Sequence, residues 1–189
     1  MHKGGLDSKI SQTLKNLKMR KLASVRRILD IRPIEGADFI EVAQVDNWNV
    51  VVKKGQYSVG EIVVYFEIDS FLPIREEFEF LRKSSYKKLA DGSEGFRLKT
   101  IRLRSQVSQG LIMPLSILYS DDIVFNKKTI LFEPKIGDDV TELLEVVKYD
   151  PPLPAELNGL ACGNFPSFIQ KTDEERIQNY TEVYEEFKK

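Results

Sequence analysis

The stretch that decides the fold is KLASVRRILDIRPIEGADFIEVAQV, residues 21–45. Residues 22–31 carry aliphatic and basic side chains without a glycine or proline, which predicts a first strand. Pro33, Gly36 and Asp38 then supply the chemistry of a turn, because each favours a backbone conformation that ends a strand. The apolar pattern resumes over residues 40–45. The stretch therefore predicts two strands and a turn that reverses the chain between them.

Further short strands are predicted on the carboxyl side of this pair. Asp46 and Asn47 are turn-forming, and residues 75–88 are charged and expected to be helical or irregular. The strands are expected over residues 48–53, 61–69, 96–104 and 107–113. Residues 61–69 are apolar enough for burial on both faces. Short strands at close spacing, separated by Gly and Pro turns, predict a mainly β protein built as a small sandwich or barrel.

The composition of the 189 residues is that of an ordinary globular domain, with 42% hydrophobic and 30% charged residues. The formal net charge is −1, so attraction to a nucleic acid has to come from local clusters of cations. No apolar run approaches the roughly 20 residues that cross a bilayer, and the first residues show no secretion signal. The single cysteine, Cys162, cannot form an internal disulfide, which favours a reducing, cytoplasmic location. One histidine and one cysteine leave no ordinary zinc site.

Two flanking zones differ from the β-rich middle. Residues 1–20 are polar and basic and predict an arm or a short helix, either ordered or disordered. From residue 149 a proline-rich linker is expected, followed by a C-terminal helix from Asp173, capped by Thr172 and Glu175. The apolar face of that helix consists of Ile177, Tyr180, Tyr184 and Phe187. This face could pack on the rest of the chain, but we favour packing on a domain that is absent.

A basic strand is predicted within GFRLKTIRLRSQVSQGL, residues 95–111. A β-bulge near Thr100 would place four cations on one outer face at a spacing that suits phosphates. These cations are Arg97, Lys99, Arg102 and Arg104. Ser108 and Gln109 could donate hydrogen bonds to phosphates or ribose hydroxyls. The alternative is an ordinary solvated strand face.

Three stretches resemble the Deinococcus-type ATP-dependent RNA ligases. Residues 165–179, FPSFIQKTDEERIQN, resemble the start of that family's nucleotidyltransferase domain, and residues 21–42 and 95–111 are similar to its N-terminal OB-fold domain. In the family the last pattern is G-x-R-x-K-T-x-R-x-R-G-x-x-S-Q-G-L, and Ser105 stands where the glycine after the second arginine is expected. The resemblance implies a five-stranded OB-type barrel with short helical insertions and a C-terminal helix. It implies an arm over residues 1–20, an OB-fold RNA-binding domain over 21–148, and a linker and truncated nucleotidyltransferase start over 149–189.

The resemblance also implies a function. The family joins RNA 3′-OH and 5′-phosphate ends through a lysyl-AMP intermediate, with ATP and Mg²⁺, on the lysine of a K-x-D-G motif that does not follow residue 179 in this chain. We therefore expect the chain to bind RNA ends or nicked duplex without a cofactor of its own and without catalysis, and to work with a separate or missing nucleotidyltransferase domain. Lys171, Asp173 and Arg176 could approach nucleotide or RNA in a complete enzyme; in this chain we expect them to cap the helix and face solvent.

Two alternatives stay open. Residues 21–42 are also similar to the OB-type tRNA-binding domains of some aminoacyl-tRNA synthetases, so the chain could be a tRNA-binding or protein-docking module. It could also be a nucleotidyltransferase with an unorthodox site. Lys88-Leu89-Ala90-Asp91-Gly92 nearly spells K-x-D-G but has one residue too many, which predicts a loop turn. Trp48 is expected in the core, and most of the other aromatic residues that could stack on bases are expected there too: Tyr57, Phe66, Phe71 and Tyr86.

Overall fold

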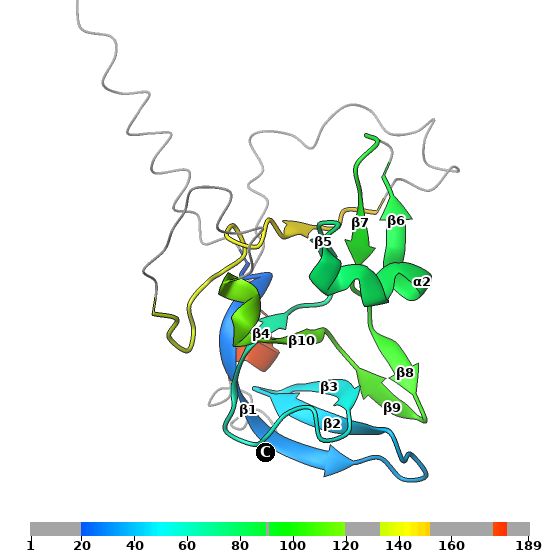
Figure 1. Ribbon diagram of the computed structural model, residues 1–189, viewed down its shortest axis with the longest axis vertical. Coiled ribbons are helices and arrows are strands. Elements are labelled where there is room, and N and C mark those ends of the chain that lie inside the picture. The colour runs from blue at the N-terminus through cyan, green and yellow to red at the C-terminus, as the bar shows by residue number, and fades with distance from the viewer. Residues whose placement is uncertain (1–19, 90, 120–132, 152–175, 181–189) are drawn as a thin grey trace, which may run out of the picture. The chain divides into compact units, whose positions relative to one another are not determined.

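The computed structural model describes residues 20–89, 91–119, 133–151 and 176–180 (Figure 1). The chain divides into two units, Met1–Arg20 with Leu153–Arg176 and Lys21–Pro152 with Ile177–Lys189. Nearly all described residues belong to the second unit, which is the folded unit discussed below. Residues 1–19 of the arm predicted over 1–20, the linker predicted from residue 149 beyond residue 151, and most of the predicted C-terminal helix lie outside the described residues.

The described part of the folded unit is mainly β. Its strands are β1 Ala23–Pro33, β2 Ile40–Val45, β3 Trp48–Lys53, β4 Ile62–Phe66, β5 Ser70–Leu72, β6 Tyr86–Lys88, β7 Glu94–Arg97, β8 Ile101–Leu103, β9 Gln106–Ser108, β10 Leu111–Pro114 and β11 Val147–Lys148. Its helical segments are η1 Glu76–Leu81, α2 Arg82–Ser85, η2 Leu115–Tyr119 and η4 Ile177–Asn179. The two segments η1 and α2 follow each other without a break, and no helix within the described ranges is long and apolar enough to span a membrane.

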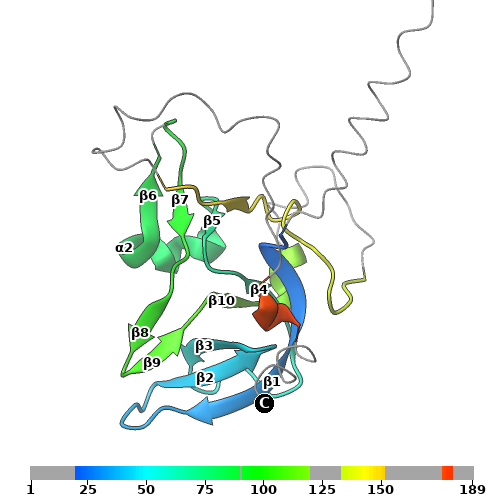
Figure 2. The ribbon, with the colours of Figure 1, turned by 180° about the vertical axis from the view of Figure 1, so that it is seen from behind.

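The main sheet has five strands in the order β10-β4-β1-β2-β3, all paired antiparallel. The long strand β1 pairs with β4 through residues 23–27 and with β2 through residues 28–33. Its register with β2 shifts between Ile28 and Asp30, and such an irregularity increases the local bend of a strand. The sheet consequently curls into a half-barrel, which is visible from behind in Figure 2. The strands predicted over 40–45 and 48–53 are confirmed. Of the predicted five-stranded OB-type barrel, the described residues show a five-stranded sheet curled into a half-barrel, with further small sheets beside it.

Strand β4 divides the core into two clusters. Val64 and Phe66 point into one cluster, whereas Val63 and Tyr65 point into the other with Ile28 and Trp48. All six side chains are almost completely buried. The prediction that residues 61–69 are buried on both faces is confirmed, and so is the prediction that Trp48 belongs to the core.

An insertion over residues 67–110 separates β4 from β10. It contributes β5, β6 and β7 to a small sheet of order β11-β5-β7-β6, the helical stretch 76–85, and the hairpin β8–β9. The predicted continuous strand over 96–104 is wrong, because the chain leaves the small sheet after Leu98. There the Leu98 N–H donates to the Ser70 carbonyl at 2.9 Å and its carbonyl accepts from Asp69. A break at residues 98–100 therefore replaces the expected one-residue bulge near Thr100.

Residues 108–110 close the open side of the curled sheet against β3. The Val51 N–H donates to Ser108 Oγ at 2.9 Å, and the Gln109 N–H donates to the Asn49 carbonyl at 2.8 Å. Gly110 follows with φ of +95°, and a Cβ there would lie 2.5 Å from the Phe66 carbonyl oxygen. This glycine splits the strand predicted over 107–113 into β9 and β10, because its left-handed backbone conformation cannot continue a strand.

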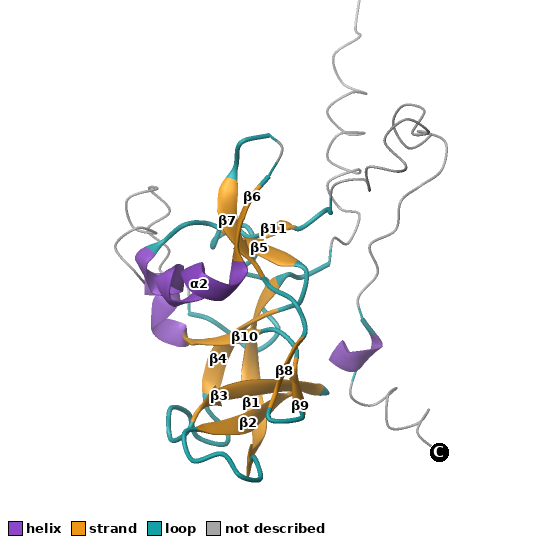
Figure 3. Cartoon of the chain, turned by 90° about the vertical axis from the view of Figure 1, so that its right-hand side faces the viewer, coloured by secondary structure: helices purple, strands orange, loops and turns teal. Residues whose placement is uncertain are grey.

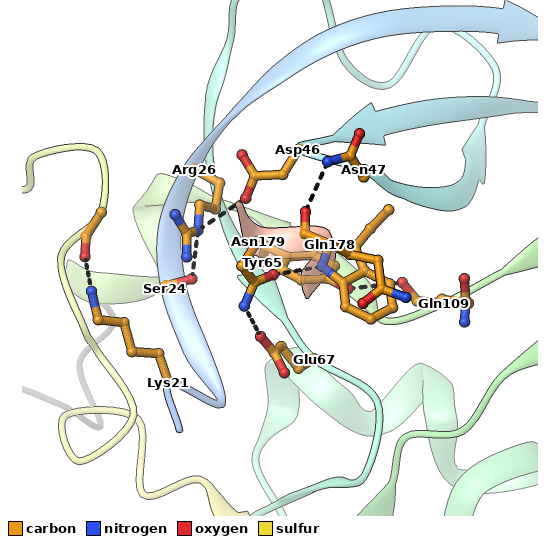
Figure 4. Close-up of polar contacts among 12 residues, drawn as sticks. Lys21, Ser24, Arg26, Asp46, Asn47, Tyr65, Glu67, Gln109, Gln178 and Asn179 are labelled. Carbon is orange, nitrogen blue, oxygen red and sulfur yellow. Dashed lines mark hydrogen bonds and ion pairs between the residues drawn. The ribbon is translucent and has the colours of Figure 1, made fainter. Parts of the chain in front are cut away.

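Residues 177–179 form the short 3₁₀ helix η4 beside the turn between β2 and β3. Trp48 Nε1 donates to Asn179 Oδ1 at 2.7 Å. Figure 4 shows Asn179 beside Glu67, where Asn179 Nδ2 donates to Glu67 Oε1 at 2.6 Å. The side-chain amide of Asn47 donates to the Gln178 carbonyl at 3.1 Å. One asparagine side chain therefore bridges a tryptophan and a carboxylate of the barrel. Of the helix expected from Asp173, the described residues 176–180 contain only the 3₁₀ turn 177–179, and the other residues of that prediction lie outside the described ranges.

Candidate nucleic-acid interface

Arg97, the first of the four cations predicted to share one outer face, contacts other side chains of the protein. It lies on β7, where its guanidinium carbon stands 4.2 Å from the Tyr149 ring centroid and Nη2 lies 4.0 Å from Asp69 Oδ1. Its side chain is half-buried between these two groups. A guanidinium over an aromatic face is attracted by the ring, so Arg97 ties β7 to the segment after β11. The expectation that it shares one outer face with the other three cations is wrong.

The remaining three cations are exposed at the hairpin β8–β9 and in the break before it. Lys99 lies in the break, Arg102 lies on β8 opposite Val107, and Arg104 lies in the turn. Arg104 and Ser105 both have positive φ, 49° and 66°, which are the signs of a two-residue type I′ hairpin turn. This geometry explains why the family pattern has glycine where Ser105 stands. The turn survives the substitution, at the cost of backbone strain.

The polar residues predicted to contact RNA, Ser108 and Gln109, both make hydrogen bonds within the protein. Ser108 is buried and its hydroxyl accepts the Val51 amide, so it serves the closure of the barrel. Gln109 is half-buried, and its carbonyl accepts from the Tyr65 hydroxyl at 3.1 Å. Lys171 and Asp173 lie outside the described residues, whereas Arg176 begins the described segment 176–180 and is half-buried. Whether any of these residues contacts RNA stays a prediction.

A groove of about 660 Å³ lies between the helical stretch 76–85 and the hairpin β8–β9. In Figure 1 the helical stretch lies above β10 and the hairpin β8–β9 lies to the right of β3, and Figure 3 shows the same elements from the side. The groove walls are mainly apolar and include Phe80, Ile101, Leu103 and Met113. Its volume is within the range of about 300–1,000 Å³ typical of ligand pockets. Phe80 is 62% exposed, a high value for an aromatic side chain.

Charged groups border the groove on both sides. Lys53 from the end of β3 and Lys99 from the break before β8 line it, and both are exposed. Glu77 lines it from η1, and its Oε2 is buried without a hydrogen-bond partner among the described residues. The neighbouring Glu79 is engaged by Arg82, which donates from Nε at 2.6 Å and from Nη2 at 2.5 Å. Among the described residues of this stretch, Glu77 is thus the carboxylate with a buried oxygen that lacks a donor.

Sequence reasoning missed Phe80 and Glu77. Both belong to EEFEFLRKSS, residues 76–85, which is charged enough to suggest a solvated segment. The signal in the sequence was a pair of phenylalanines two positions apart, Phe78 and Phe80, within this charged stretch. In the structure Phe78 is completely buried and Phe80 is exposed. The aromatic residues singled out instead are not available as stacking surfaces: Tyr57, Phe66 and Phe71 are buried, and Tyr86 is half-buried against Phe96 and Arg82.

The stretch that nearly spells K-x-D-G is a hairpin turn between β6 and β7, as predicted. The Leu89 N–H donates to the Ser93 carbonyl at 2.8 Å, and Asp91 Oδ1 accepts from Ser93. Lys88 Nζ donates to Glu94 Oε1 at 2.9 Å, and this hydrogen bond raises the pKa of the lysine above its usual value. Lys88 is therefore held by a carboxylate in an exposed turn, which does not match the arrangement of an activated nucleophilic lysine. Within the described ranges there is also no cluster of three or more acidic, His or Cys side chains suited to a metal ion.

Comparison with known proteins provides independent evidence on what this chain is similar to. Residues 22–115 match an OB-fold domain family. No curated protein matches the chain. Among solved structures, a mutant of Naegleria gruberi RNA ligase in its apo form is 42% identical with a TM-score of 0.68, and the match covers 89% of this chain and 46% of the ligase. The same ligase with PPi, at 42% identity and a TM-score of 0.68, is matched over 89% of this chain and 47% of its own.

A third structure, a mutant of the same ligase with ATP and Mn, is also 42% identical with a TM-score of 0.68, and the match covers 88% of this chain and 47% of that one. The chain therefore spans about half the length of the ligase chains it matches. An identity of 42% over most of the chain is far above what a shared fold alone produces. The chain thus contains an OB-fold domain over residues 22–115 and, over 89% of its length, is homologous to about half of an RNA ligase.

Proposed function

We propose that this chain is the RNA-binding OB module of an ATP-dependent RNA end-joining system. The observation that carries the proposal is the homology to Naegleria gruberi RNA ligase over 89% of the chain. OB folds commonly bind oligonucleotides, and the exposed cations Lys99, Arg102 and Arg104 supply local positive charge on a chain whose net charge is −1. The substrates proposed are RNA ends and nicked duplex, with catalysis supplied by a nucleotidyltransferase domain.

The described residues do not fit an ATP site. The near-match to the lysine motif around Lys88 is a turn whose lysine is paired with Glu94. Lys171-Thr172-Asp173, which has the K-x-D spacing with Glu174 in place of glycine, lies outside the described residues. We therefore route no step of the reaction through these residues. Incubation with labelled ATP and a divalent metal is expected to leave no AMP on this chain. Recovery of an adduct on Lys88 would contradict the assignment of a binding module and favour an unorthodox nucleotidyltransferase.

Binding itself is tested by fluorescence anisotropy with labelled RNA at several salt concentrations. The double variant Arg102→Ala with Arg104→Ala should bind nicked RNA duplex more weakly, and the slope of log affinity against log salt should become shallower by about one to two units. Both side chains are exposed, so the fold should be retained. Wild-type protein that binds tRNA better than nicked duplex would indicate the tRNA-binding alternative, and protein that binds no RNA would contradict the proposal.

A further inference from the structure

We propose that the groove between residues 76–85 and the hairpin β8–β9 binds an unpaired base of an RNA strand, with a preference for bases that carry an exocyclic amino group. This inference rests on the proposed RNA-binding function and adds to it a location and a base preference. It is carried by three features of the groove: an exposed aromatic wall, cations at its border, and a carboxylate oxygen without a donor among the described residues.

The apolar walls suit the flat face of a base. On β8, Ile101 and Leu103 line the groove, whereas Arg102 between them does not. The hairpin therefore separates an apolar side from a basic one, as strand alternation requires. Opposite this apolar side, Phe80 offers its ring with 62% of the residue exposed. A base can stack on such an aromatic ring whatever its identity, because every base has a flat π-face.

The charges at the border favour a nucleic acid over an apolar protein segment. Lys53 and Lys99 are exposed at the groove, where the phosphates that flank a bound base would lie. A second hollow of about 750 Å³ beside the turn between β6 and β7 is a weaker candidate. Its lysines are accompanied by at least as many carboxylates, including Glu94, which already pairs with Lys88. Of these two hollows, the first joins an open apolar wall to cations for which the described part of the chain shows no such ion pair.

Glu77 gives the groove a means of selection. A buried oxygen without a donor is costly, and the terminal torsion of a glutamate is soft, so the carboxylate can turn towards a donor in the groove. Adenine, cytosine and guanine offer an exocyclic amino group on the edge that single-strand readers use. Uracil instead offers one N–H between two carbonyl oxygens. The partial negative charge of these oxygens repels a carboxylate. Glu77 should therefore favour the three amino bases over uracil.

The first experiment separates stacking from phosphate contact. The probe is an RNA duplex with a short single-stranded 3′ end of A, C, G or U, measured by anisotropy against salt. Phe80→Ala should weaken binding of the amino-base probes by about five- to fifty-fold and leave the salt slope unchanged, because no charge is lost. The matched control is Phe39→Ala, which removes another exposed phenylalanine, 81% exposed and outside the groove, and should bind like the wild type. Lys99→Ala should instead make the slope shallower by about 0.7.

The second experiment tests selection. Glu77→Gln should reduce the preference for A, C and G ends over U ends, because the amide can both donate and accept. Glu76→Gln, a change at the exposed neighbour, should leave the preference as it is. A preference retained in Glu77→Gln would overturn the assigned role of Glu77.

The outcomes also separate this inference from the proposed function. If the wild-type chain binds none of the probes, the RNA-binding function itself is wrong. If the wild type binds and the double Arg102 and Arg104 variant is weakened, while folded Phe80→Ala and Leu103→Ala bind like the wild type, the groove is not the base site. In that case its apolar walls belong to a protein contact. Circular dichroism and thermal unfolding of each variant establish that it is folded.

Discussion

The barrel strands and the insertion over residues 67–110 are stabilised in different ways. In β4 nearly every side chain is buried, and its two faces contribute side chains to two separate core clusters. The insertion supplies a few core residues, including Phe78 and Phe96, but much of its surface consists of short strands, turns and exposed pairs such as Lys88 with Glu94. The proposed RNA-contacting groups nearly all lie on the insertion. The barrel therefore provides stability, and the insertion provides a surface that can vary at little cost to folding.

The substitution expected to lower the free energy of unfolding most is Gly110→Ala, at the junction between the barrel and the insertion. The added Cβ would meet the Phe66 carbonyl and the Tyr65 ring, both at 2.5 Å, at a φ of +95°. Overpacking and left-handed strain together should lower the free energy of unfolding by about 2–4 kcal/mol in urea titrations. Gly60→Ala is the matched control, since Gly60 has φ of +88° and a Cβ added there would meet no described atom within 4 Å. Equal losses in both variants would show that strain alone matters at Gly110.

The second change, Asn179→Ala, tests whether the segment after the insertion belongs energetically to the barrel. It removes the hydrogen bonds of Asn179 to Trp48 and to Glu67, two almost completely buried residues. We expect a loss of about 1–3 kcal/mol in the same titrations. Gln178→Ala is the control, because Gln178 contacts Asn47 through its backbone carbonyl, which the substitution keeps. A stability equal to that of the wild type would show that the barrel does not depend on this contact.

The third change should increase stability and should do so without touching either core cluster. Ser105 occupies a left-handed position, φ +66°, in the exposed turn between β8 and β9. Ser105→Gly removes that strain, and the gain net of glycine's entropy in the unfolded chain should be about 0.5–1 kcal/mol. Thermal unfolding measures it. A loss of stability would mean that the serine makes a compensating contact in the turn.

The smallest effect concerns Asp46, in the turn between β2 and β3. Burial raises the pKa of this carboxyl, Arg26 at 3.5 Å lowers it, and Glu67 raises it, with a net increase. Ionisation of Asp46 therefore costs stability as pH rises above the unfolded-state pKa and through the folded-state pKa. Asp46→Asn should be more stable than the wild type at neutral pH, and the difference should vanish in acid. A variant that is less stable at neutral pH would show that the attraction of Arg26 outweighs burial.

The strands of the barrel could be predicted from the sequence because their patterns are local. Residues 40–45 and 48–53 are rich in β-branched and aromatic side chains on either side of a turn-forming Asp46-Asn47 pair, and the observed strands have those bounds. The double burial of β4 followed from its unbroken apolar run. In each case one short window held all the information needed.

The insertion could be predicted only in part, because its structure depends on partners far away in the chain. The residues around Leu98 give no indication that its backbone bonds to Asp69 and Ser70 or that the chain leaves the small sheet directly afterwards. The position of Arg97 over Tyr149 likewise joins residues about fifty positions apart in the sequence. The groove combines three separate segments, so no single window contained it. The basic character of residues 97–104 was visible, but not its distribution over different faces.

The bridge made by Asn179 has a practical consequence, because Trp48 is the only tryptophan of the chain. Its indole is completely buried, stacks on Tyr65 with ring centroids 6.2 Å apart, and donates to Asn179. Intrinsic tryptophan emission is therefore a built-in optical signal for this one contact, with no label required. Release of residues 177–179 would let water reach the indole N–H and shift the emission to longer wavelength, well before the barrel unfolds. Rapid-mixing fluorescence can then time the docking of this segment in the unmodified chain.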